Sequence, residues 1–172
     1  MITAKRRRPM HAEWDFPRIK KDDLVAEFPG VFDGARYTDI GIGWLGLVRA
    51  FVTEALPHDP SLTVREMKEK WGTMRLWCDT PVLEARLAKG KAEAKSGMTC
   101  EVCGAEGWLR RPPPGRMAWW RTLCPEHASP QQIEWGQQTR WTAGRMQFAG
   151  QWYKYDRETD SMVPVETPER FR

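Results

Sequence analysis

The sequence has no apolar stretch long enough to cross a bilayer, because the best candidate, residues 40–56, contains Arg49 and Glu54. It also lacks a secretory signal, since acidic residues follow the basic run near the N-terminus where an apolar segment would be needed. We therefore expect a cytoplasmic protein that does not bind membranes and keeps its cysteines reduced. In a reducing compartment, closely spaced cysteines indicate a metal site rather than disulfide bonds.

Recognisable catalytic motifs are missing as well. There is no Gly-rich phosphate loop, and no Ser or Cys nucleophile stands beside a base. His11 and His58, two of only three histidines, have no spacing to a partner that suits a metal ligand or a general base. Zinc deaminases also need an open coordination position on the metal, which the four-ligand set described below does not leave. We therefore predict a protein that is not an enzyme and takes no small-molecule substrate.

Tryptophan and basic residues are what the chain has in excess. It holds ten Trp against three Tyr, and Trp suits half-buried positions and interfaces. A net charge of +4 on 172 residues permits nucleic acid or an acidic partner and requires neither. The basic run Lys5, Arg6, Arg7 and Arg8 lies in residues 1–20, which we interpret as a flexible arm. This arm is either simply solvated or contacts the phosphates of nucleic acid.

Residues 21–97 are predicted to form an α+β domain of helix, β-hairpin and helix. The first helix is expected over residues 39–56, where apolar residues recur at helical spacing. Three glycines weaken its first turns and indicate that another element packs closely there: Gly41, Gly43 and Gly46.

The β-hairpin of this domain is expected over residues 62–78, with its turn at Gly72. The charged residues 66–70 could instead form a short helical turn. Cys78 alternates with apolar residues in the second arm, so we interpret it as a buried structural thiol.

The second helix is expected to start at Thr80 and Pro81, a capping hydroxyl followed by a first-turn proline, and to end at Ser96. Its later part is rich in Lys, Ala and Glu. That composition is typical of a solvated helix between two halves of a chain.

The strongest motif is a set of four metal ligands. Cys100 and Cys103 are separated by two residues and followed by Gly104, which is the pattern of a zinc knuckle. Cys124 and His127 repeat the two-residue gap further along the chain. Three thiolates and one imidazole fill a tetrahedral site and leave no open position for a water molecule. We therefore predict one structural Zn²⁺ ion and no catalytic metal.

The zinc-binding module is expected to cover residues 98–145. Strands at 108–111 and 116–123 would form a hairpin around a Pro-rich loop, and Ser129 would cap a helix running towards Gly144. A knuckle, a hairpin and a ligand pair at a helix start are together typical of a treble-clef finger. A zinc ribbon is the alternative fold.

The C-terminal segment, residues 146–172, is expected to be a hairpin followed by a tail. Phe148, Trp152 and Tyr155 fall on its first arm, and residues 162–165 form the returning arm. Together with the preceding parts, this makes the predicted fold class α+β.

The hairpin of the zinc module is rich in Arg and Trp, a combination found both in protein hot spots and in nucleic-acid grooves. Duplex binding would need a longer basic stripe, whereas a compact patch is enough for a protein partner. Alternatively, Trp rings cover the metal site and the arginines are only solvated. The predicted partner-binding residues are Arg110, Arg111, Arg116, Trp119, Trp120 and Arg121.

Two patterns in the chain are familiar as a pair. Residues 67–76 form a Lys-Glu-Lys-aromatic-Gly stretch, and residues 100–107 with 120–127 form a Cys-x-x-Cys-Gly … Leu-Cys-x-x-His pattern. Together they resemble small uncharacterised zinc-binding proteins of phages and prophages, with Met74 standing where the pattern has leucine. The resemblance covers about residues 40–128. It implies a zinc site and a location in the host bacterial cytoplasm, and it carries no activity.

The leading hypothesis is a non-enzymatic, zinc-stabilised interaction protein that binds and inhibits a host protein or ribonucleoprotein, as anti-CRISPR and other anti-defence proteins do. The alternative is a DNA- or RNA-binding accessory or regulatory protein that uses the basic arm and the zinc hairpin. A degenerate treble-clef nuclease is the third hypothesis. It is disfavoured because the hairpin has no histidine base and the following helix offers only glutamines and Glu134.

Overall fold

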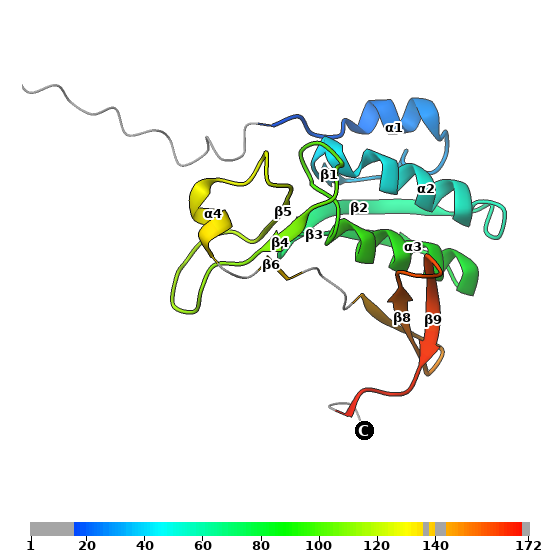
Figure 1. Ribbon diagram of the computed structural model, residues 1–172. Helices are drawn as coiled ribbons and strands as arrows, with labels where there is room; N and C mark the ends of the chain where they lie inside the picture. Colours follow the sequence, from blue (N-terminus) through cyan, green and yellow to red (C-terminus); the bar gives the residue numbers. More distant parts are fainter. Residues whose placement is uncertain (1–15, 136–137, 140–143, 170–172) are drawn as a thin grey trace, which may run out of the picture.

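The computed structural model describes residues 16–135, 138–139 and 144–169, within which three small three-stranded sheets combine with short helices (Figure 1). This is a mixed α+β architecture, as the sequence predicts. Lys5, Arg6, Arg7 and Arg8 of the predicted arm lie outside the described residues. Among the described helices, none is both long and apolar enough to cross a membrane.

The first sheet has the order β1-β2-β3, with β1 at Tyr37–Asp39, β2 at Thr63–Lys70 and β3 at Thr73–Asp79. β2 and β3 form the predicted antiparallel hairpin, so the charged end of β2 is strand and not a helical turn. The hairpin turns at Trp71 and Gly72, whose φ angles of 56° and 73° lie in the left-handed region that tight two-residue turns require. β1 joins β2 in parallel.

The helix predicted over residues 39–56 begins later than expected. α2 spans Leu45–Ala55 and follows a 3₁₀ turn, η2, at Ile42–Trp44. The reason is that Asp39 belongs to β1, where it pairs with Lys68. Asp39 is therefore a strand residue and does not begin the helix.

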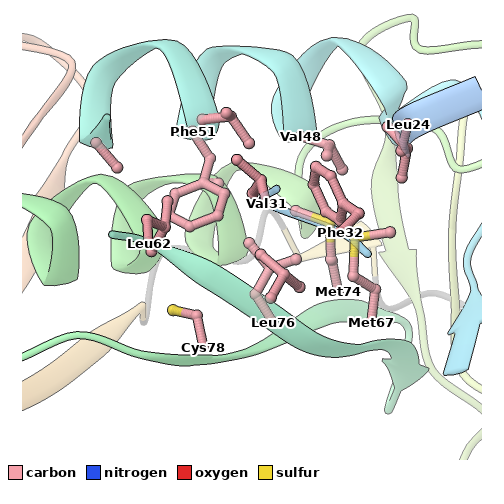
Figure 2. Packing of buried hydrophobic residues seen from close by; sticks show 14 of the residues in the cluster. Leu24, Val31, Phe32, Val48, Phe51, Leu62, Met67, Met74, Leu76 and Cys78 are labelled. Atoms are coloured by element: carbon pink, nitrogen blue, oxygen red, sulfur yellow. The ribbon is translucent and has the colours of Figure 1, made fainter. Parts of the chain in front are cut away.

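The main core lies between α2, the first sheet and α1, a helix at Lys21–Glu27 that the sequence pattern does not predict. Figure 2 shows side chains of α2 and of the sheet packed together, among them Phe51 and Met74. Cys78 lies in the same cluster and is 4% exposed, which confirms that this thiol is buried. Burial raises the pKa of Cys78, so it stays protonated at neutral pH.

α3 spans Leu83–Ser96 and also begins later than predicted. The hydroxyl of Thr80 donates a 2.5 Å hydrogen bond to Asp59 Oδ2 and does not cap the helix. The prediction that the later part of α3 is solvated is wrong. α3 lies between the main core and the C-terminal sheet, so its small residues are buried: Ala85, Ala88, Gly90, Ala92, Ala94 and Ser96.

α3 also covers the open edge of β3. Glu93 accepts a hydrogen bond from the backbone N–H of Leu76 at 2.7 Å, and the Ser96 hydroxyl accepts one from the N–H of Met74 at 2.8 Å. These N–H groups face away from β2, so side chains of α3 take the place of a further strand.

The C-terminal segment contains the predicted hairpin, as β8 at Gln151–Asp156 and β9 at Ser161–Val165, and adds a third strand, β7 at Arg145–Phe148, to it. The strands lie in the order β7-β8-β9, each antiparallel to the next. The extra strand arises because Ala149 and Gly150, with φ angles of 47° and 85°, make a second tight turn. Apolar residues of this sheet pack against α3.

The remaining sheet belongs to the segment with the predicted metal ligands. It has the order β5-β4-β6, with β4 at Trp108–Arg110, β5 at Arg121–Leu123 and β6 at Gln138–Thr139. β5 is shorter than predicted because the prolines that follow Arg111 have no N–H with which to extend the ladder. The helix after the ligands, α4 at Pro130–Glu134, is also short, because the chain returns to this sheet as β6.

Candidate metal centre

The four predicted ligands come together in the structure. One ligand atom from each of Cys100, Cys103, Cys124 and His127 lies within 4.8 Å of all the others. Cys100 follows α3 in the chain, Cys124 comes directly after β5, and His127 precedes α4. None of the three cysteines is in a disulfide. The group can hold a metal ion.

The separations within this group fit a tetrahedral ion. With bonds of about 2.3 Å to sulfur and about 2.1 Å to nitrogen, such an ion holds two sulfurs about 3.8 Å apart and sulfur about 3.6 Å from nitrogen. Cys103 Sγ lies 3.8 Å from Cys124 Sγ. His127 Nδ1 lies 3.2 Å from Cys124 Sγ and 3.8 Å from Cys100 Sγ. These three separations lie within about 0.4 Å of those that a tetrahedral metal requires.

The first ligand pair is held by a tight turn. The N–H of Gly104 donates to the carbonyl of Cys100 at 2.8 Å, and the N–H of Cys100 donates to the carbonyl of Ala105 at 2.8 Å. Gly104 has a φ of 80°, a conformation that favours glycine. The glycine after Cys103 thus does what the knuckle pattern predicts.

The second ligand pair leads into a capped helix. The N–H of His127 donates to the carbonyl of Cys124 at 3.2 Å, which closes the turn between the two ligands. The Ser129 hydroxyl then accepts from the N–H of Gln132, whose side chain accepts from the N–H of Ser129. This reciprocal capping box confirms the predicted helix start.

The thiols of the two pairs differ in acidity. Burial raises the pKa of Cys100 to about 11. Burial also acts to raise the pKa of Cys124, but hydrogen bonding to His127 and to the other thiols lowers it to about 7. Without metal, at least one ligand is therefore protonated at neutral pH, so metal binding must release protons.

The knuckle packs directly on the glycines that precede α2. A Cβ added to Gly41 would lie 2.1 Å from the carbonyl oxygen of Glu101, and one added to Gly43 would lie 2.2 Å from that of Cys100. The close approach predicted from the glycines is confirmed at these two positions. It does not occur at Gly46, where an added Cβ has no neighbour within 4 Å among the described residues.

Two polar contacts hold the centre in place. Trp44 Nε1 donates to the carbonyl of Thr99 at 2.7 Å. Glu101 and Arg121 form a buried ion pair of 2.5 Å. Burial raises the pKa of Glu101, and the charge of Arg121 opposes that rise. The Trp44 contact therefore docks the metal-binding segment on the first domain, and the Glu101–Arg121 pair holds the knuckle to β5 within the segment. Breaking either contact would leave a buried polar group without its partner.

Arg110 is a charged residue beside the centre that the sequence placed on the surface. Its side chain is 2% exposed, and its Nε and Nη1 atoms have no hydrogen-bond partner within the described part of the chain. Burial lowers the pKa of Arg110, and the charge of Cys124 raises it. A buried cation without a counter-charge is costly. A divalent ion bound to three thiolates and a neutral imidazole carries one net negative charge, so a bound metal fits this position.

The predicted Arg and Trp surface is smaller than expected. Arg110 and Arg121, at 2% and 5% exposed, are buried, so their placement on that surface is wrong. The reason is register: these two residues lie opposite each other in β4 and β5. The residues of the predicted set that remain accessible are Arg111, Arg116 and Trp119, with Trp120 half-buried.

A residue missed by sequence reasoning completes this surface. Trp71, at the tip of the β2–β3 hairpin, is 59% exposed, and its ring meets that of Trp120 edge-on at 5.3 Å. The guanidinium of Arg111 lies 5.3 Å from the centre of the Trp120 ring. The Thr122 hydroxyl donates to the carbonyl of Gly72 at 2.6 Å, which joins the two hairpins. The two stretches that carry the phage resemblance are therefore in contact.

No protein-family model, curated protein or solved structure matches the chain.

Proposed function

We propose that this chain is a non-enzymatic interaction protein stabilised by one structural zinc ion. The near-tetrahedral spacing of three thiol sulfurs and one imidazole nitrogen carries the proposal. Soft thiolate ligands favour zinc over hard cations such as magnesium or calcium. With all four positions taken by the protein, zinc would have no open position for a substrate or a reactive water, and its role would be to hold the fold together.

The order of elements around the ligands favours a treble-clef finger over a zinc ribbon. A knuckle at Cys100 and Cys103 is followed by the short β4–β5 hairpin, and α4 begins at Pro130, shortly after His127. A ribbon would place its second ligand pair on another knuckle between strands. The capping box at Ser129 instead supports a helix start at that place.

The interaction surface that we propose consists of Trp71, Arg111, Arg116, Trp119 and Trp120 and is called the Trp/Arg surface below. Exposed Trp and Arg are enriched in protein hot spots, because they combine large apolar contact with strong hydrogen bonding. No acidic residue occurs between Gly107 and Pro125, so a protein partner rich in carboxylates would be favoured. In the phage context that the resemblance implies, this partner is a host protein that the chain inhibits.

The proposal has two tests. Elemental analysis of the purified protein should find about one zinc per chain; absence of zinc would refute the structural role of the metal.

The second test concerns the Trp/Arg surface. A partner is captured from host lysate and identified, and its binding is then measured with both proteins in pure form. A Trp71→Ala/Trp119→Ala double variant should lose binding, whereas Trp77→Ala, an equally exposed tryptophan on a different face, should not. Equal binding by both variants would rule out the Trp/Arg surface.

A further inference from the structure

A second feature of the surface lies away from the metal ligands and from the Trp/Arg surface. A hollow of about 290 Å³ opens between the first sheet and α3, two elements that run side by side in Figure 1. Its volume is at the small end of ligand pockets. The side chains that line it include Lys68, Lys70, Arg75, Trp77, Lys89 and Glu93.

The register of the sheet explains why these side chains gather on one face. Lys68 pairs with Arg75 across the β2–β3 ladder, and Glu66 pairs with Trp77 in the next row that faces the same way. Side chains alternate along a strand, so the residues between them, such as Met67 and Leu76, turn to the core. The hollow is therefore the polar face of a half-buried sheet, closed on one side by α3.

The charges of the hollow do not balance. Glu66 pairs with Lys68 at 2.5 Å, and Glu93 pairs with Lys89 at 2.9 Å, so each carboxylate already has a cation. Lys70 and Arg75 have no carboxylate partner within the described part of the chain. Four cations against two carboxylates leave a surplus of two positive charges, which suits an anionic ligand.

Arg75 is held in place before any ligand binds. Its Nη1 atom donates to Thr73 Oγ1 at 2.8 Å and to the carbonyl of Met74 at 2.9 Å. These bonds leave other N–H groups of the guanidinium available, and its planar shape suits a phosphate. A cation fixed in this way loses little conformational entropy when it binds.

Trp77 adds a flat apolar wall to this basic site. Its side chain is 62% exposed although it lies within β3 and not at a hairpin tip. Such a ring offers a stacking face for a nucleic-acid base. Tyr37 of β1 lies in the same row of the sheet, beyond Glu66, and is 49% exposed. Two exposed aromatic rings on one basic sheet face resemble the way in which single-stranded nucleic acid is bound by sheets in general.

We propose that this hollow binds a nucleotide, with the base stacked on Trp77 and the phosphate held by Arg75 and Lys70. The nucleotide is either free or one unit of a single strand. An acidic peptide would satisfy the charges but would leave the flat ring of Trp77 without a matching planar group. The inference does not depend on the proposed function, because neither a metal ligand nor a residue of the Trp/Arg surface lines the hollow.

The test uses the full chain in its metal-loaded form and two labelled probes, a mononucleotide and a single-stranded oligonucleotide, with binding followed by fluorescence anisotropy. Trp77→Ala should weaken binding by about 5- to 150-fold, the loss of one base stack, and Trp77→Phe should recover most of it. For the oligonucleotide, Arg75→Met should lower the slope of log affinity against log salt by about 0.7, the value of one phosphate contact on a single strand.

Matched controls separate this site from general basicity. Arg65→Met removes an exposed cation from β2 that does not line the hollow, and Trp119→Ala removes a tryptophan from the Trp/Arg surface. Both should bind as the wild type does. Zinc content and circular dichroism of each variant confirm that it is folded.

The outcomes divide cleanly. Tight binding of the mononucleotide assigns the site to a free nucleotide, and binding of the oligonucleotide alone assigns it to a single strand; both support the proposal if Trp77→Ala weakens them. No binding of either probe at low salt overturns it. Binding that Trp77→Ala does not weaken also overturns the proposal, and is expected if the strand contacts only the N-terminal arm. Equally tight binding of polyglutamate overturns it as well.

Discussion

Replacing Arg110 by methionine tests whether this buried cation is the counter-charge of the metal centre. Its Nε and Nη1 atoms have no hydrogen-bond partner among the described residues, although the side chain is buried. A bound zinc ion with three thiolates and a neutral imidazole carries one net negative charge, which would balance the guanidinium. We therefore expect Arg110→Met to weaken zinc binding.

Arg110→Met should have opposite effects on two quantities: it should lower the zinc affinity and should not lower the stability of the metal-free protein. Loss of a group that supports metal ligands from outside typically lowers metal affinity by about 10- to 100-fold, or ~1.4–2.8 kcal/mol. The metal-free protein should respond in the opposite direction, because replacing a buried charge by an apolar side chain is neutral or stabilises by ~1–4 kcal/mol. If Arg110 only fills space, both the zinc affinity and the metal-free stability should fall.

Two measurements check this prediction. Competition with a chromophoric chelator gives the zinc affinity, and urea unfolding in the presence of EDTA gives the stability of the metal-free protein. Arg111→Met is the matched control, because Arg111 is the next residue in the chain but its side chain is exposed and lies on the Trp120 ring. Arg110→Lys keeps the charge and should recover most of the affinity. Unchanged zinc affinity in Arg110→Met, together with a less stable metal-free protein, would refute the counter-charge.

Three further predictions concern how the centre forms and how it is docked. Gly43→Ala should destabilise the protein by ~1–3 kcal/mol in urea unfolding, because its Cβ would meet the knuckle backbone, whereas Gly46→Ala in α2 should stabilise it by ~1 kcal/mol; equal effects would show that the knuckle does not pack there. Trp44→Phe should cost ~1–3 kcal/mol by leaving the carbonyl of Thr99 without its donor, and a cost near zero by the same method would contradict this. The zinc affinity should fall as the pH is lowered below about 7, the metal-free pKa of Cys124, because protons then compete with the metal for the thiolates; an affinity that does not change with pH below 7 in a chelator assay would contradict it.

The ligand set and the hairpins could be predicted because their signals are local. Cys100 and Cys103 reach one point whenever the chain turns between them, and Gly104 supplies the conformation for that turn. Gly72 likewise marks the turn of the first hairpin. In each case a few neighbouring residues determine the backbone, so distant parts of the chain do not change the outcome.

Burial within the β4–β5 hairpin could not be predicted in the same way. Arg110 and Arg111 are neighbours of the same residue type, yet one is buried beside the metal ligands and the other is exposed. The difference follows from which side of β4 faces the ligand cluster, and that is set by pairing with β5 and β6. A three-residue strand has too short a pattern to reveal its inner face.

The prediction that the later part of α3 is solvated was wrong for a related reason. Its Lys, Ala and Glu composition is typical of a solvated helix when read alone, yet the small residues are buried because α2, β3 and the C-terminal sheet all pack against it. The long side chains cover the rest of its surface and pair with acids of other elements, as Lys91 does with Glu54 at 2.7 Å. The composition of a helix therefore predicts how much of it is buried only when the elements that pack against it are known.

The sequence by itself determined that Cys100, Cys103, Cys124 and His127 form one group, because spacing and residue type are properties of short segments. Only the tertiary structure decided what surrounds that group and what else the chain displays. It buried Arg110 beside the ligands, placed Trp71 next to Trp120, and gathered four cations around Trp77, because these placements depend on strand register and on packing between segments far apart in the chain.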